Sequence, residues 1–253
     1  MNSKHSCIWG GVIFFINYIG CEVIFILSNV LSIYCKVSFI ANAFGIVLNL
    51  SLIAFILFLY ENKVRPLRYK INKRKVKLLF ISLLFTVSAV VVLNFIYELR
   101  FNLFNEQFIV VDFVKIDCQY LSALFYFQRL IYAPIFEEVF YRDFLQKIIL
   151  KKQNSYIAII CSAVIFALFH FDMNKIFFTF LGGLIFGFLY HKTTIITIPI
   201  LSHFICNLMY TVCVFYCADF NLNSTFIFLC SLVLLVFSIL FIQKQKKEIE
   251  KSG

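Results

Sequence analysis

Long apolar runs, separated by short polar segments, set the pattern of this chain. A transmembrane helix needs about 20 consecutive and mostly apolar residues. Several stretches approach that requirement, near residues 8–34, 37–60, 78–97, 120–150, 155–171, 175–191, 194–215 and 224–242. The pattern therefore predicts an all-α fold, a polytopic membrane helical bundle of about eight transmembrane helices. No internal repeat or low-complexity linker divides the chain, so we expect residues 1–253 to form a single integral membrane domain.

The fourth apolar run, 120–150, is too long for one simple span. Pro134 lies near its middle, and proline lacks the N–H that an interior helical position uses. Proline is well suited to the first turn of a helix, however. We therefore expect the helix either to break near Pro134 or to start afresh there.

Two glycines in the sixth apolar run suggest close helix packing. Gly183 and Gly187 are four residues apart and lie on one face of a helix. Such a small-xxx-small pair lets a neighbouring helix approach closely. We expect this pair to be part of the scaffold.

The composition favours a bilayer over water as the solvent of this chain. Hydrophobic residues make up 62% of the 253 residues, and charged residues only 14%. A soluble domain is typically about one quarter charged. The net charge of +10 could suggest nucleic acid, but the basic residues cluster in short segments between apolar runs. No nucleic-acid-binding motif is present, so we expect the lipid bilayer, and no nucleic acid, as their partner.

The basic loop residues predict the orientation of the chain. Segment 61–77 carries eight lysines and arginines against one glutamate, and the positive-inside rule places such a loop in the cytoplasm. Alternating spans then put the acidic loop 98–119 outside and the basic C-terminal tail inside. Both termini are therefore expected in the cytoplasm. High usage of Lys, Ile, Asn and Phe suggests an AT-rich bacterial genome, and hence a bacterial plasma membrane.

Charged residues inside a span are costly unless they are paired. Glu138 and Arg142 are four residues apart with the acid first, which is the favourable order for an ion pair within a helix. Glu137 lies about 100° from Glu138 around an α-helix, so that pair does not neutralise it in the same way. An ion pair for structure alone leaves this second carboxylate unexplained. Glu22 in the first span is another lone acid, and we assign it no role.

Two further polar pairs lie downstream. Phe166 and His170 are four residues apart, as are His203 and Asn207, so each pair shares one helical face. A lone histidine in a helix is more often a packed core residue or a helix-end residue than a catalyst, and we expect His191 to be of that kind. The combination of the pairs is more informative than either histidine alone.

The polar residues of three spans lie at a similar predicted depth. Counted from the nearest predicted cytoplasmic loop, Glu137 lies 14 residues deep, His170 15 and Asn207 13. At 1.5 Å per residue, each lies about 20 Å deep. His203 lies one turn shallower than Asn207. The sequence therefore allows four polar groups from three spans to meet inside the membrane.

Taken together, these residues resemble the motifs of the CPBP intramembrane proteases, also called the CAAX protease and bacteriocin-processing, or Abi, family. The motifs are E-E-x-x-x-R (Glu137, Glu138, Arg142), F-x-x-x-H (Phe166, His170) and H-x-x-x-N (His203, Asn207). Each is weak alone, and three in this order are specific. They lie within a family-like catalytic core over residues 120–215. The resemblance implies a helical bundle with a catalytic cavity inside the bilayer and a glutamate-activated water as the nucleophile.

The resemblance also implies four catalytic roles. Glu137 is expected to act as general base on a water molecule, which His170 helps to orient and polarise. His203 and Asn207 are expected to donate hydrogen bonds to the oxyanion of the tetrahedral intermediate.

Three further residues are expected to support the site. Glu138 and Arg142 hold the helix and its electrostatics, which keeps Glu137 ionised despite desolvation. Phe166 lines the site. No cofactor is predicted. Members of the family have been labelled metal-dependent, and two histidines with a carboxylate and an amide could hold a metal. Asparagine is a poor zinc ligand, however, and no H-E-x-x-H motif occurs, so we expect a metal-free reaction and keep a metal as the alternative.

We therefore predict an intramembrane endopeptidase that cleaves a membrane-associated peptide or protein near or within the membrane. Two alternatives stay open. The first is a bacteriocin self-immunity or scaffolding protein of the same fold without proteolysis. The second is a proton-coupled transporter that uses the buried acid and the histidines as a relay. Proton-coupled uptake that survives Asn207→Ala would favour the transporter, because an amide carries no proton.

Overall fold

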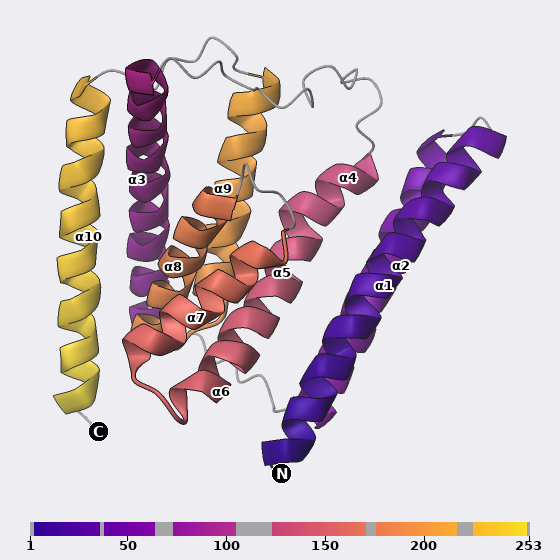
Figure 1. Cartoon of the computed structure of the whole chain (residues 1–253), viewed down its shortest axis with the longest axis horizontal. Coiled ribbons are helices and arrows are strands. Elements are labelled where there is room, and N and C mark those ends of the chain that lie inside the picture. The colour runs from indigo at the N-terminus through magenta and orange to yellow at the C-terminus, as the bar shows by residue number, and fades with distance from the viewer. Residues whose placement is uncertain are drawn as a thin grey trace. The chain divides into compact units, whose positions relative to one another are not determined.

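The computed structural model describes residues 3–35, 38–63, 73–104, 123–170, 176–216 and 225–251, and the regular structure of these residues is entirely helical (Figure 1). The helices outside the fourth apolar run are α1 (Ser3–Cys35), α2 (Ser38–Lys63), α3 (Lys73–Phe104), α7 (Ser155–Leu168), α8 (Ile176–Thr193), α9 (Thr197–Tyr216) and α10 (Thr225–Lys251). The fourth apolar run forms one continuous composite helix over residues 123–150. The predicted all-α fold is confirmed.

Five described helical stretches are long and apolar enough to cross a membrane: Ile8–Ser28, Ala43–Asn62, Val76–Leu93, Ile176–Thr193 and Ile227–Lys244. Helix α7 is apolar but shorter. Large hydrophobic side chains also point outward from these helices, and Phe15, Phe80 and Val233 are each about two thirds exposed. Such an outer surface suits lipid rather than water. Most of the predicted loops 61–77 and 98–119 lies outside the described residues, so the orientation of the chain stays a prediction.

The chain divides into two compact units, and each is described by itself. The first comprises residues 1–70 and 119–140, and the second comprises residues 71–118 and 141–253. In the first unit, α1 packs along α2, and α2 also contacts α4 (Ala123–Phe127) (Figure 1). In the second unit, α3 packs on α9 and α10, and α8 packs on α7, α9 and α10. The prediction of a single membrane domain stays a prediction.

The core of the second unit holds α9 in place. Its buried members are Leu78, Ile81 and Phe85 of α3, Leu189 of α8, Ile198 of α9 and Ile242 of α10. Four helices thus share one apolar cluster, and between membrane helices such a cluster is held by van der Waals packing rather than by removal of apolar surface from water. Ile198 lies five residues before His203, so this cluster fixes the first turns of the helix that carries the H-x-x-x-N motif.

The composite helix changes its winding on both sides of the two glutamates. It runs through α4, the π-helical segment η3 (Gln128–Tyr132), α5 (Ala133–Glu138), the π-helical segment η4 (Val139–Gln146) and α6 (Lys147–Leu150). Helix α5 directly follows η3, and Pro134 is its second residue. The last turn of η3 closes with a bond from the Ala133 N–H to the Gln128 carbonyl, five residues back. The wider π turn accommodates the proline without a break. Pro134 lies in the first turn of α5, as suits a proline, but the predicted break or fresh start is wrong, because the helix continues through this position and changes only its winding.

At Gly183 and Gly187, α8 closely approaches its neighbours. A Cβ atom added at Gly183 would lie 3.0 Å from the Ala163 Cα of α7. One added at Gly187 would lie 3.0 Å from Gln146 Oε1 and 3.1 Å from Ile159 Cγ2. Real Cβ atoms rarely approach their neighbours this closely. The close packing predicted for this glycine pair is therefore confirmed.

Candidate active site

Both histidines of the predicted site contact the ring of Phe166. Phe166 lies on α7 and is almost fully buried, with 1% of its surface exposed. The His170 ring meets it edge-on at a centroid distance of 4.7 Å, and the His203 ring meets it edge-on at 5.9 Å. The structure therefore brings the histidines of two separate motifs, one just after α7 and one on α9, to one aromatic side chain.

His170 follows α7 rather than lying within it. The helix ends at Leu168, and the His170 N–H donates to the Ala167 carbonyl at 3.1 Å, a tight last turn typical of helix ends. The predicted span to residue 171 is thus slightly too long. The Nδ1 atom of His170 lies 2.8 Å from the Phe166 carbonyl oxygen. A carbonyl can only accept, so Nδ1 carries the proton, and in the neutral ring Nε2 is the acceptor.

His203, on α9, is buried between the aromatic rings of Phe166 and Phe186. Its exposure is 6%, and its ring stacks on Phe186 of α8 at 4.8 Å with an interplanar angle of 20°. Asn207 lies one turn further along the same helix and is half-buried. The Thr211 hydroxyl donates to the Asn207 main-chain carbonyl at 2.7 Å. The stacked ring holds one fixed orientation, which suits a group that must aim a hydrogen bond.

Arg142 meets the same aromatic ring. This residue of η4 is fully buried, and its guanidinium carbon lies 5.2 Å from the centroid of Phe166. Its Nη1 atom donates to Ser162 Oγ of α7 at 3.0 Å. Tyr141 also packs edge-on against Phe166, at 5.1 Å. Phe166 is therefore the common neighbour of a buried cation and two imidazoles.

Glu137 and Glu138 end α5. Glu138 is fully buried and Glu137 is half-buried. Both belong to the first compact unit, whereas Arg142, the histidines and Asn207 belong to the second. The four-residue spacing from Glu138 to Arg142 runs into the wider turns of η4, which change the rotation between the two side chains from that of a plain α-helix. The ion pair between them and the base role of Glu137 stay predictions. Glu22 lies in α1, and its side chain is outside what the structure describes.

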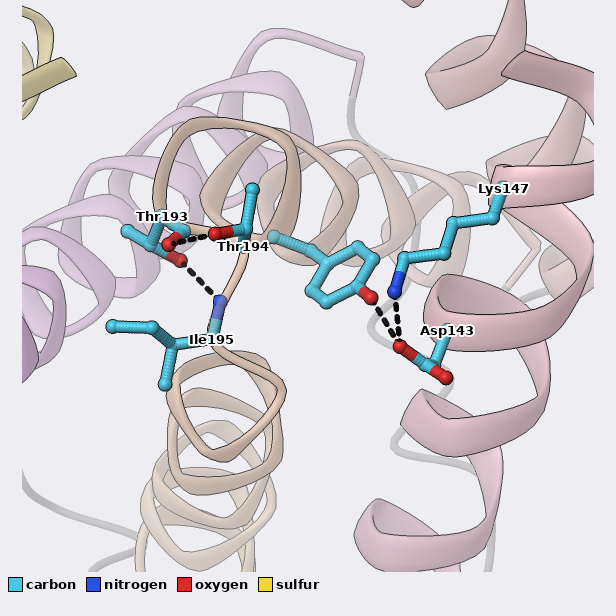
Figure 2. Close-up of polar contacts among 6 residues, drawn as sticks. Asp143, Lys147, Thr193, Thr194 and Ile195 are labelled. Atoms are coloured by element: carbon cyan, nitrogen blue, oxygen red, sulfur yellow. Dashed lines mark hydrogen bonds and ion pairs between the residues drawn. The ribbon is translucent and has the colours of Figure 1, made fainter. Parts of the chain in front are cut away.

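The sequence reasoning missed a group of buried polar residues beside the motifs. Asp143, 4% exposed, accepts hydrogen bonds from Lys147 Nζ at 2.5 Å and from the Tyr190 hydroxyl of α8 (Figure 2). Gln146, 2% exposed, binds the main chain of α8 at Gly187. The acid–base spacing from Asp143 to Lys147 is visible in the sequence and could have been found there. Gln146 carries no such signal, because its partner is 41 residues away.

The turn from α8 into α9 is held by threonine hydroxyls (Figure 2). Thr193 Oγ1 donates to the Leu189 carbonyl at 2.7 Å and accepts from the Ile195 N–H at 3.4 Å. Thr194 has a φ of 57°, and its N–H donates to the Tyr190 carbonyl at 2.7 Å. This is the left-handed conformation that commonly ends a helix. The turn sets where α9 begins.

Among the described residues, no group of three or more His, Cys, Asp or Glu side chains is placed to hold one metal ion. The described part of the site offers groups for proton transfer and hydrogen bonding. A buried imidazole, an exposed imidazole with an acceptor nitrogen, an amide and a buried cation are the groups that can supply it.

Comparison with known proteins places these motifs in a family context. Residues 119–209 match a family model described as type II CAAX prenyl endopeptidase Rce1-like. Over this range the chain resembles the Rce1-like endopeptidases. The predicted resemblance to the CPBP intramembrane proteases is thereby confirmed. The range contains the E-E-x-x-x-R, F-x-x-x-H and H-x-x-x-N residues. Together with the apolar helices, it identifies an integral membrane protein.

A relative in Bacillus subtilis (strain 168), the candidate membrane peptidase YdiL, is 34% identical to the chain over 77 residues. The aligned stretch covers 30% of this chain and 32% of YdiL, so the chain matches about a third of the length of this relative. No solved structure matches the chain significantly.

Proposed function

We propose that this protein is an intramembrane endopeptidase that hydrolyses a peptide bond in a membrane-associated peptide or protein, near or within the bilayer. The observation that supports this most is the meeting of His170, His203 and Arg142 at Phe166. These residues come from three helical segments, and all of them lie inside the Rce1-like range. An apolar membrane chain that places two imidazoles and a guanidinium on one ring has a site for polar chemistry.

In the proposed reaction, Glu137 is the general base. It takes a proton from a water molecule while the water oxygen bonds to the scissile carbonyl carbon. His170 holds that water through Nε2, because its Nδ1–H is directed to the Phe166 carbonyl. The carbon–nitrogen bond then breaks, and the proton passes from Glu137 to the leaving amine. These proposed steps need no metal ion.

His203 and Asn207 supply the oxyanion contacts in this proposal. Both are on one face of α9, one turn apart, and His203 is fixed by its stack on Phe186. Two preorganised donors stabilise the negative charge that develops on the carbonyl oxygen, and losing one such donor typically costs about 3 kcal/mol in the transition state. Glu138 and Arg142 would hold the electrostatics around the base.

A Glu137→Gln variant tests this mechanism. The amide is cheaper to bury than a carboxylate, so the fold should persist. It cannot accept the proton of water, so kcat should fall at least about a hundredfold. The substrates are two synthetic peptides in detergent micelles, one with a prenylated cysteine near its C-terminus and one with an acyl anchor. Cleavage is followed by mass spectrometry of the purified wild type and variant, with and without a chelator.

Glu61→Gln is the matched control, because Glu61 is an exposed glutamate near the end of α2 and should leave kcat unchanged. Full activity of Glu137→Gln would contradict the base role. Reversible loss of wild-type activity on metal removal would favour a metalloprotease instead. A wild type that cleaves neither peptide would favour the immunity, scaffolding or transport alternatives.

A further inference from the structure

A directed chain of hydrogen bonds joins Arg142 to the main chain of α8. Arg142 Nη1 donates to Ser162 Oγ at 3.0 Å. The Ser162 hydroxyl has two acceptors, Gln146 Oε1 at 3.4 Å and the Ile159 carbonyl at 3.1 Å. Gln146 Nε2 then donates to the Gly187 carbonyl at 3.0 Å. The charge of Arg142 is thus connected through one hydroxyl and one amide to the backbone of another helix.

These side chains are out of contact with solvent. Arg142 and Ser162 are each 0% exposed, and Gln146 is 2% exposed. In such surroundings, hydrogen bonds polarise one another and an unmatched polar atom is costly. The Gln146 amide uses both ends, its nitrogen toward α8 and its oxygen toward Ser162. A flip of the amide would turn its oxygen toward the Gly187 carbonyl, which cannot donate, so this contact defines the orientation of the amide.

The backbone of α8 passes close to this amide at Gly187. A Cβ atom at Gly187 would lie 3.0 Å from Gln146 Oε1 and 3.6 Å from Arg142 Nη1. The glycine therefore lets α8 close over the amide and the guanidinium together. Gln146 bridges the Gly187 carbonyl and the Ser162 hydroxyl, and the same hydroxyl accepts the hydrogen bond of Arg142.

The position of Arg142 reaches the histidines through Phe166. The guanidinium lies over the ring at 5.2 Å, and the same ring contacts His170 and His203. A cation over an aromatic ring and imidazoles in T-shaped contact with it each restrict where the ring can lie. A displacement of Arg142 would therefore displace both imidazoles.

We propose that Gln146 is a positioning residue of the active site: it fixes Arg142 against Phe166, and through that ring it orients His170 and His203. The inference rests on the proposed endopeptidase function and extends it to a residue outside the three motifs. Gln146 touches no reacting atom in this scheme. A positioning role predicts a loss of kcat with substrate binding intact, because the orientation of the imidazoles matters most in the transition state.

Two substitutions test the role. Gln146→Leu keeps the approximate size and removes both hydrogen bonds. Gly187→Ala keeps Gln146 and pushes on it. Each should lower kcat about tenfold, which is the scale of one ordinary hydrogen bond, with KM unchanged. Gly182→Ala is the control on the same helix, since the nearest atoms to its added Cβ, at 3.7 Å and 3.9 Å, belong to Phe186 at ordinary contact distance.

A second readout does not depend on activity. The chain has four histidines, so the ¹H–¹³C signals of their Cε1 positions can be assigned from single His→Gln variants. Gln146→Leu should shift the signals of His170 and His203 in the folded protein. Gln153→Leu, a change of an exposed glutamine, should leave them in place.

The two readouts separate the two proposals. If the wild type cleaves neither peptide, the endopeptidase function is wrong, and the histidine signals still decide the positioning role. Unchanged signals in Gln146→Leu, or a wild-type kcat for the folded variant, would overturn that role. So would a raised KM at constant kcat. If Gln146→Leu does not fold, Gly187→Ala decides the matter by the same criteria, since it removes no polar group.

Discussion

Phe166 is the residue on which the described site depends, and its chemistry explains why it can serve three polar partners. An aromatic ring has a negative face and a positive edge. Arg142 lies over Phe166 at 5.2 Å, where a cation is attracted, and the two imidazoles meet it edge-on. An aliphatic side chain of similar size would fill the space and lose the attraction for the guanidinium. The F-x-x-x-H motif therefore combines packing with electrostatics.

Removing the buried cation should destabilise the protein. Arg142→Ala removes the donor to Ser162 and the cation over Phe166, and it takes away the predicted partner of the fully buried Glu138. Breaking a buried pair of charges typically costs about 3–5 kcal/mol, so we expect a clear drop in the thermal unfolding temperature in detergent. Lys152→Ala, at an exposed lysine, is the control. An unfolding temperature equal to that of the wild type would show that Arg142 has no structural role.

The site residues differ in how well the sequence can reveal them. Charged and imidazole side chains stand out in apolar runs, because their burial needs a reason. Spacing then groups them by face, which is how Phe166 was linked to His170. Ser162 gives no such signal, since small hydroxyls are common in membrane helices, and its bond to Arg142 spans 20 residues. Gln146 also gives no signal in the sequence, because its partner Gly187 is 41 residues away. The residues that hold a site are found only when the helices are placed together.

At the scale of elements, the helix that carries the glutamates is wound irregularly. Only six residues, Ala133–Glu138, keep α-helical winding between two π-helical segments. Pro134 accounts for η3 ahead of it. The second segment, η4, is tied to α7 and α8 by Arg142, Asp143 and Gln146. Such π-helical segments are rare in proteins overall, and those that occur are frequently at functional sites. They persist where several side-chain contacts hold them in place.

The turn that starts α9 offers a test of its backbone strain. Thr194 has a φ of 57°, a conformation in which a β-branched residue is strained and glycine is not. Thr194→Gly should therefore raise the free energy of unfolding by about 1 kcal/mol, less the small contribution of its hydroxyl bond to the Thr193 carbonyl. Thr197→Gly, within the first turn of α9, should lower it. Thermal unfolding in detergent measures both, and a destabilised Thr194→Gly would contradict the strain argument.

The sequence predicted the presence and approximate place of the helices, which length and hydropathy determine. It did not predict where a helix changes from α-helical to π-helical winding. The apolar runs gave helices at each expected place within the described residues, because a buried backbone in lipid must satisfy its own hydrogen bonds. The π-helical segments could not be foreseen, since a pattern with a period of 3.6 residues does not separate α from π winding. The end of α7 before His170 was missed for the same local reason: its last turn tightens without a Gly or Pro to mark it.

At the scale of the whole molecule, the orientation of the chain in the membrane determines the depth expected for the site residues. The basic loops predict that both termini lie in the cytoplasm, and the same alternation puts the first residues of the stretch Ala43–Asn62 outside and its last residues inside. Because charged loops resist crossing the bilayer, independent loops that agree make the assignment firmer than any one of them. The depth expected for Glu137, His170 and Asn207 depends on this orientation, since it was counted from the cytoplasmic side.

Cysteine labelling in intact bacteria tests the orientation. Single cysteines at Ala43, Asn62 and Lys151 are introduced into a chain whose nine native cysteines are replaced by alanine. All three positions are exposed and lie at or near helix ends. A membrane-impermeant maleimide should label position 43 from outside, and positions 62 and 151 only after permeabilisation, because the positive-inside rule keeps both basic segments in the cytoplasm. Labelling of 62 and 151 from opposite sides would require an odd number of crossings between them, and the depth that brings the glutamate and the histidines to one level would no longer hold.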